Sequence, residues 1–141
     1  MAYVSHILVG RPVFSVTEDM TVADVARRMA ELKVGAIMVL DQGRLSGLFS
    51  ERDLMTRVVV AGLDPGKTLV REVMSTHLAT IDESATVEQA MQTMHDRGCR
   101  HLPVMRDSEV AGFISMRDLM AVELESKTEE LMQMRAYIMS A

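Results

Sequence analysis

The chain has 141 residues, which is enough for one domain with a substantial core but short for two independent ones. Apolar residues make up 48% and charged residues 25%, the balance of a globular protein rather than a disordered chain. The net charge of −5 argues against binding to nucleic acid or to an anionic membrane surface, and no apolar run approaches the ~18 residues of a membrane span.

The first predicted helix follows Thr21, a residue type that caps helix N-termini. Its apolar residues have the i, i+3, i+4, i+7 spacing of an amphipathic helix: Val22, Val25, Ala26 and Met29. Two short apolar runs, 36–40 and 44–49, then predict two strands joined by a turn. A further helix is expected to begin after Ser50.

The connector contains the turn sequence Asp-Pro-Gly within 63–68, and Thr68 is expected to cap a short helix after it. The same order of elements then returns. Thr86 precedes a second amphipathic stripe, the runs 101–105 and 109–114 predict two more strands, and a helix is expected after Ser115.

The C-terminal region allows two interpretations. One helix could run from near Met116 to about Ile138, with an apolar stripe that is interrupted by Lys127. Alternatively, Ser126 and Glu129 could form a capping box that starts a separate helix. In both cases the stripe needs cover from the domain itself or from another subunit.

An internal duplication explains why the elements recur. Residues 15–55 align without a gap to residues 80–120, with identities at 11 of 41 positions. The final stretch is the densest match, because GLFSERDLM lies over GFISMRDLM. The order strand–helix–strand–strand–helix, given twice, predicts an α/β or α+β fold in which two copies pack together.

Each copy contains the string G-h-h-S-x-R-D, where h is apolar, at the junction of a strand and a helix: Gly47–Asp53 and Gly112–Asp118. The first turn of a helix offers free N–H groups, a serine can donate to a phosphate or ribose oxygen, and arginine pairs with phosphate. A carboxylate can accept from both hydroxyls of a ribose. Ser-x-x-Asp is also an ordinary capping box, but a cap does not require the arginine that both copies carry.

These features resemble the CBS (cystathionine-β-synthase) domain over roughly residues 11–125. The resemblance implies one tandem pair over 1–141, called a Bateman module, with repeats at 11–70 and 76–125 and a helical extension at 126–141. Each repeat would be a short sheet packed on two helices. The family implies clefts between the repeats that bind adenosine compounds such as AMP, ADP, ATP, NAD(H) or S-adenosylmethionine. It also implies a homodimer that forms through the CBS faces and the C-terminal helix.

The resemblance assigns candidate nucleotide-binding residues. Ser50, Asp53, Ser115 and Asp118 would contact ribose and phosphate, and Arg52 and Arg117 are phosphate candidates. The second copy also has the basic-h-Pro-Val strand of the family, which adds Arg100, His101 and Pro103 to the candidates; Thr80 is a weaker one. The first copy has Gly35 to Val39 there, without a basic residue or proline, so the two clefts are expected to differ.

Metal binding and catalysis are not predicted. His95, Cys99 and His101 lie close in sequence, but that stretch should pass from a helix end into a strand, so their side chains should diverge. Cys99 aligns with Val34 and is interpreted as a small buried apolar residue. His101 is interpreted either as a phosphate contact or pH-sensitive group, or as a surface histidine. No glycine-rich phosphate loop or catalytic triad pattern is present.

The sequence therefore predicts a cytoplasmic, non-enzymatic regulatory module that binds an adenine nucleotide. A single cysteine and an N-terminus without signal-peptide features are consistent with the cytoplasm. The alternative is a protein-interaction adaptor with vestigial clefts, which the 14 methionines and the C-terminal stripe would suit. We favour the interpretation that most methionines fill the core.

Overall fold

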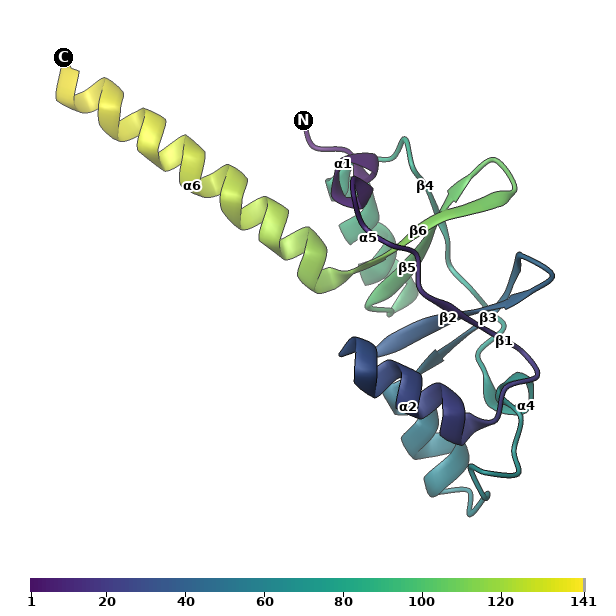
Figure 1. The fold of residues 1–141 in the computed structure, drawn as a ribbon. Coiled ribbons are helices and arrows are strands. Elements are labelled where there is room, and N and C mark those ends of the chain that lie inside the picture. Colours follow the sequence, from purple (N-terminus) through teal and green to yellow (C-terminus); the bar gives the residue numbers. More distant parts are fainter. Residues whose placement is uncertain (141) are drawn as a thin grey trace.

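The computed structural model describes residues 1–140 and contains two small sheets that are each covered by helices (Figure 1). The first unit comprises β1 (Ser15–Thr17), α2 (Val22–Leu32), β2 (Ala36–Asp41), β3 (Arg44–Ser50), α3 (Glu51–Asp53) and η1 (Leu54–Val59). The second unit comprises β4 (Ile81–Asp82), α5 (Val87–Arg97), β5 (His101–Arg106), β6 (Glu109–Ser115) and α6 (Met116–Ser140). The order strand–helix–strand–strand–helix, predicted for each copy, is confirmed, and the fold is α+β.

The two sheets have the same topology. In each, the first strand pairs in parallel with the second, and the second pairs antiparallel with the third. The register shifts once in each hairpin, between Val39 and Leu40 and between Val104 and Met105, which are equivalent positions of the repeat. The duplication is therefore preserved down to the local irregularity of the strands.

The predicted caps of the two amphipathic helices are confirmed. The Thr21 hydroxyl accepts from the backbone N–H of Asp24, and the Thr86 hydroxyl accepts from that of Gln89. Both helices end on a left-handed residue, Lys33 in the first unit and glycine in the second. The apolar residues of each helix are buried in the core of the same unit, where they pack against its sheet.

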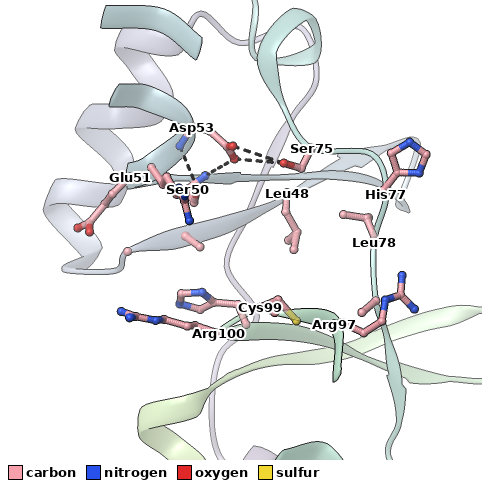
Figure 2. A pocket seen from close by; sticks show the side chains of 16 residues that line it. Leu48, Ser50, Glu51, Asp53, Ser75, His77, Leu78, Arg97, Cys99 and Arg100 are labelled. Carbon is pink, nitrogen blue, oxygen red and sulfur yellow. Dashed lines mark hydrogen bonds between the residues drawn. The ribbon is translucent and has the colours of Figure 1, made fainter. Parts of the chain in front are cut away.

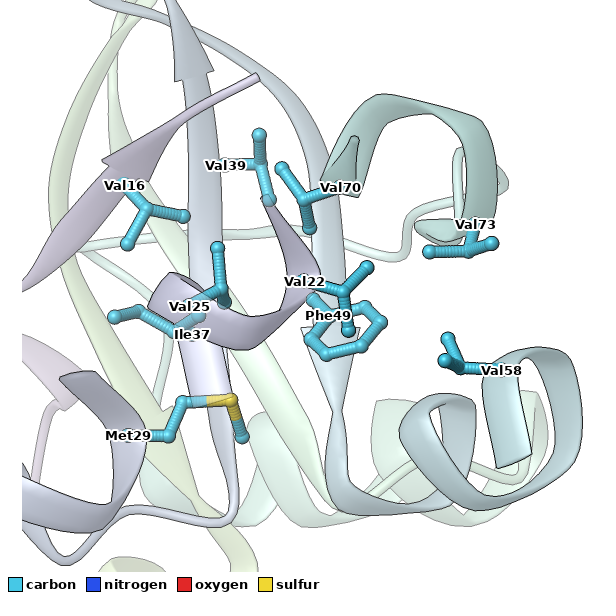
Figure 3. Packing of buried hydrophobic residues seen from close by; sticks show 10 residues of the cluster. All are labelled: Val16, Val22, Val25, Met29, Ile37, Val39, Phe49, Val58, Val70 and Val73. Atoms are coloured by element: carbon cyan, nitrogen blue, oxygen red, sulfur yellow. The ribbon is translucent and has the colours of Figure 1, made fainter. Parts of the chain in front are cut away.

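The core of the first unit lies between α2 and the sheet. Phe49 of β3 and Ile37 of β2 are fully or almost fully buried against the Val22–Val25–Met29 face of α2 (Figure 3). Val58 of η1 closes one side. The remaining cover comes from Val70 and Val73, which belong to the short helix α4 (Val70–Val73).

α4 belongs by sequence to the approach to the second copy, yet it packs on the first. The reverse holds for α1 (Val4–Leu8), a helix that the sequence did not predict. Val4 is fully buried in the core of the second unit, and its N–H donates to the Ala85 carbonyl at 2.8 Å. We call α1 and α4 the exchanged helices, because each covers the core of the other repeat.

Thr68 was expected to cap α4, which is wrong, because its hydroxyl donates to the Asp64 carbonyl at 2.8 Å. The Leu69 N–H instead donates to the Glu72 carboxylate at 2.7 Å. The C-terminal region is one continuous helix, α6, rather than two, and it projects away from the rest of the molecule (Figure 1).

Candidate functional site

A cleft of about 760 Å³ lies between the two units, a size typical of small-molecule sites. Its walls come from the strand–helix junction of the first unit, from the connector before β4 and from the start of β5. The lining residues are Gly35, Ala36, Leu48, Ser50, Glu51, Arg52, Asp53, Ser75, His77, Leu78, Ala79, Arg97, Gly98, Cys99, Arg100 and His101. Both sequence copies therefore contribute to one cleft.

Asp53 anchors the first wall of the cleft. Its backbone N–H donates to the Ser50 hydroxyl, and its carboxylate accepts from the Ser50 N–H, both at 3.1 Å. The capping box that the sequence allowed is thus present. The same carboxylate accepts from the Ser75 hydroxyl at 3.4 Å (Figure 2). Arg57 Nε lies 3.6 Å from it. The carboxylate is held firmly while remaining part of the cleft lining.

The opposite wall is basic. Arg97, Cys99 and Arg100 lie across the cleft from Ser50 and Asp53 (Figure 2). Guanidinium groups pair well with phosphate oxygens, whereas a carboxylate suits ribose hydroxyls. A polar ligand with a sugar at one end and a phosphate at the other matches this division of the two walls.

Apolar residues supply the third component. Leu48 of β3 and Leu78 of the connector both line the cleft, together with Ala36 and Ala79 (Figure 2). Pockets for flat heterocycles combine such apolar walls with a few polar groups that fix orientation. The cleft can accordingly hold an aromatic base, a sugar and an acidic group at once.

His101 lies at the junction of the two units. Its ring stacks on Phe113 with the centroids 5.4 Å apart and the planes 15° from parallel. Burial lowers its pKa, while the Asp118 and Glu51 carboxylates oppose that shift and Arg100 adds to it. Of the interpretations left open by the sequence, the plain surface histidine is wrong, because His101 is half-buried and lines the cleft.

The second junction has the same Ser–Asp capping box, but its carboxylate has a different arginine partner. The Ser115 N–H donates to the Asp118 carboxylate at 2.8 Å, and the Asp118 N–H donates to the Ser115 hydroxyl at 3.2 Å. The arginine that pairs with the carboxylate here is Arg11, at 3.2 Å, in the place that Arg57 has beside Asp53. The two junctions therefore differ in two ways. Arg11 of the N-terminal segment reaches only the second, and the strand with the basic residue and proline belongs only to the second copy.

The cleft unites five of the ten candidate residues: Ser50, Arg52, Asp53, Arg100 and His101. Ser115, Arg117 and Asp118 form the other junction, at the start of α6. Pro103 is buried in β5, where it pairs with Phe113, and Thr80 is exposed just beyond the lining residue Ala79.

Sequence reasoning missed Ser75 and Arg11, which reach the two carboxylates from outside the aligned repeats. Both belong to segments that lead into the first strand of a copy. Their positions are not matched between the copies, so the internal alignment carried no signal for them. Only the packing of each lead-in segment on the other repeat brings them to the junctions.

Two further properties concern residues 1–140. In this range, no three side chains among histidine, cysteine, aspartate and glutamate come together as a metal site would require. The helices of the same range include none that has both the length and the apolar character to cross a bilayer.

The fold and the cleft define a class of protein: a tandem α+β pair with a ligand-sized cleft between its repeats. The family model for the CBS domain matches the chain twice, at residues 4–60 and 70–125. The chain belongs to the CBS domain family, as the sequence predicted. Both matches begin at an exchanged helix, so the family pattern includes these helices.

Relatives and solved structures agree with this assignment. The chain is 34% identical over 127 residues to the CBS domain-containing protein CBSX3, mitochondrial, of Arabidopsis thaliana, covering 86% of this chain and 62% of that protein. A putative signal-transduction protein with CBS domains from Burkholderia ambifaria superposes with a TM-score of 0.83 at 29% identity, covering 88% and 95% of the two chains.

A second solved structure shares the fold at lower identity. The CBS domain pair of protein MJ0100, in complex with 5′-methylthioadenosine and S-adenosyl-L-methionine, has a TM-score of 0.79 at 19% identity. The match covers 89% of this chain and 98% of that one.

Proposed function

We propose that this protein is a regulatory module that binds an adenine nucleotide in the cleft anchored by Asp53. AMP, ADP or ATP is the proposed ligand, with NAD(H) and S-adenosylmethionine as further adenosine compounds to be tested. Binding would change the conformation of the pair or its affinity for a target protein. The module would act without catalysing a reaction itself.

The observation that carries the proposal is the division of the cleft walls. The Asp53 carboxylate and Ser50 hydroxyl line one side, Arg97 and Arg100 line the other, and leucine side chains lie between them. This arrangement suits a ribose, a phosphate and a base respectively. The MJ0100 pair, which has the same fold, binds adenosine compounds, and this gives the ligand class further support.

The experiment is calorimetric titration of nucleotide-free protein with AMP, ADP, ATP, NADH and S-adenosylmethionine in turn. Asp53→Asn keeps an acceptor for the Ser50 N–H but removes the charge. A charged hydrogen bond contributes about 1.5–3 kcal/mol. We therefore expect affinity to fall about 10- to 100-fold in this variant.

Asp118→Asn is the matched control, because it makes the same change at the equivalent junction. Asp118 does not line this cleft, so this variant should reduce affinity much less. Wild-type affinity in both variants would refute the site assignment. If none of the five compounds binds to the wild-type protein, the adaptor function becomes the better explanation.

We also propose that the protein is a homodimer, through the faces of the CBS pair and through α6. The support is the exposed apolar surface of α6, where Leu124 and Leu131 are 70% and 63% exposed. The same surface favours the adaptor as the second candidate function. A partner recovered from cell extract equally well with and without added nucleotide would support the adaptor, and recovery only with nucleotide would contradict it.

A further inference from the structure

α6 extends well beyond the domain that it starts from. Only Leu119 in this helix is buried, and every residue from 124 to 140 is exposed. In proteins most of the stability of a helix comes from packing of its apolar face against another surface. The single chain provides no such surface for the exposed part of α6.

Most of the exposed large apolar residues of α6 fall on one stripe with the period of a coiled coil; Met132, Tyr137 and Met139 lie outside it. Alternate steps of four and three residues connect the positions of this stripe, which is the spacing of the two core positions in a seven-residue repeat. We call these six positions the α6 seam: Met120, Leu124, Lys127, Leu131, Met134 and Ile138. Five of the six are apolar, and the apolar ones are 58–70% exposed.

We propose that α6 forms a parallel two-stranded coiled coil with α6 of a second copy of this chain. The inference deepens the homodimer proposed above and does not depend on nucleotide binding. Two copies of the seam are complementary to each other, since each apolar layer meets the same layer of the partner. Leu124, Leu131 and Ile138 would occupy one core position, with Met120 and Met134 at the other.

Charges beside the seam determine the direction of the two helices. Glu130 directly precedes the core residue Leu131. In a parallel pair, a residue in that place faces the residue five places later on the partner helix, which is Arg135. By symmetry this Glu130–Arg135 pair forms twice, once on each side of the dimer. An antiparallel pair in the same seam would place Glu130 opposite its own copy and leave Arg135 opposite Ala121. Only the parallel arrangement gives two attractive pairs.

Lys127 is the charged residue within the seam. Its ammonium lies 3.6 Å from the Glu130 carboxylate of the same helix, so its charge is already directed to the edge of the seam. A single polar core position fixes register and subunit number at a cost in stability. The Lys127 layer would accordingly favour one alignment of the two helices over shifted ones.

The first test is the oligomeric state, measured by light scattering without nucleotide. Leu131→Glu should weaken the dimer and raise the concentration at which it dissociates to monomers, while Met132→Glu should not. Met132 is the matched control, because it is neighbouring, apolar and 65% exposed but lies outside the seam. A monomeric wild-type protein across micromolar concentrations, or equal effects of both substitutions, would overturn the proposal.

The second test concerns direction. Ile138→Cys, in a Cys99→Ala background, should form a disulfide between two chains under mild oxidation if the helices are parallel. In an antiparallel pair the two cysteines would lie about 27 Å apart, at 1.5 Å per residue, and would not react. Dimers that resist this cross-link would show that the helices are not parallel.

A charge exchange provides an independent readout. Arg135→Glu should weaken the dimer at low salt, and the double variant Glu130→Lys, Arg135→Glu should restore it. Failure of the double variant to recover would contradict the pairing. Nucleotide titration of Leu131→Glu separates the two proposals, because the cleft does not include α6. A weakened dimer with unchanged nucleotide affinity supports the coiled coil and leaves the binding proposal standing.

Discussion

Asp53 and Asp118 occupy equivalent positions in the two repeats but have different neighbours. Asp53 accepts from Ser75, lies 3.6 Å from Arg57 of its own repeat and lines the cleft. Asp118 pairs with Arg11, which lies outside the aligned repeat, and does not line that cleft. The duplication thus produced two similar junctions, which differ in the origin of the arginine that pairs with the carboxylate.

Arg11 can be tested as the residue that makes the junctions unequal. Wild-type protein should bind one nucleotide per chain tightly, at the Asp53 cleft. Arg11→Ala frees the Asp118 carboxylate, so we expect a second, weaker binding event in calorimetry. The added Asp118→Asn substitution should remove it. An unchanged stoichiometry in Arg11→Ala would show that the ion pair does not control the second junction.

His101 should make stability depend on pH. Burial lowers its pKa in the folded protein below the usual value near 6.5, so the unfolded chain binds the proton more tightly. This contribution to stability is fully present above pH ~6.5 and is lost as the pH falls toward the folded pKa. His101→Gln should weaken the decline in free energy of unfolding between about pH 8 and 5.5. Urea titrations of the nucleotide-free protein at both pH values provide the measurement; parallel pH profiles for the two proteins would contradict the assignment.

At the scale of elements, the exchanged helices depend on two glycines. A side-chain methyl on Gly47 would overlap the Met74 thioether and come within 3.0 Å of the Ser75 carbonyl oxygen. The same group on Gly112 would overlap only the end of the Leu8 side chain. Each glycine therefore lets an exchanged helix, or the residues that follow it, approach the strand closely.

Alanine at either glycine should reduce stability by about 1–3 kcal/mol through overpacking. The larger loss is expected for Gly47→Ala, because a backbone oxygen yields less easily than a flexible leucine. Gly35→Ala is the matched control, since its added methyl would make only ordinary contacts, at 3.5 Å from Glu51. Equal losses in all three variants, measured by chemical unfolding, would contradict this account.

The sequence predicted the individual helices and strands well, but not which distant segments pack on each core. The amphipathic spacing and the threonine caps defined α2 and α5, and the duplicated runs defined the hairpins, because those signals lie within each element. α1 is short and has no amphipathic period, so nothing in its own residues indicated a helix. Its stability comes from Val4, which is buried in a core cluster whose other buried residues are more than seventy positions away.

The residues of the candidate site also divide into those with a signal in the sequence and those placed only by packing between the repeats. The repeated junction supplied Ser50, Asp53 and their counterparts, because a duplicated motif is visible in the chain itself. Arg100 and His101 came from the family resemblance and do line the cleft. Ser75 and Arg11 could not be found in this way, because their roles depend on how the lead-in segments cross between repeats.

At the scale of the whole molecule, the exchange of helices makes the two repeats mutually dependent. The half containing residues 1–66 lacks Val70 and Val73, which are 0% and 6% exposed in the core of the first unit. A fragment of equal length, 11–76, includes them. The boundary of the first structural unit therefore lies after α4, whereas a division of the chain into equal halves by sequence would fall before it.

These two fragments provide a direct test. Fragment 11–76 should show more helical structure and a more cooperative thermal transition than fragment 1–66, because it retains α4 over the first core. Circular dichroism at matched concentrations is sufficient to compare them. Equally folded fragments, or a better-folded 1–66, would show that the exchange contributes little to stability.

α6 has one further consequence, which follows from where it begins. Its first turn carries Asp118, held by Ser115 and Arg11, and its far end is Ser140. At 1.5 Å per residue the helix is about 37 Å long, so a rotation of only about 5° at the first turn would move its tip by about 3 Å. A rearrangement too small to disturb the core would be magnified at the tip, which makes α6 a lever arm attached to the second junction.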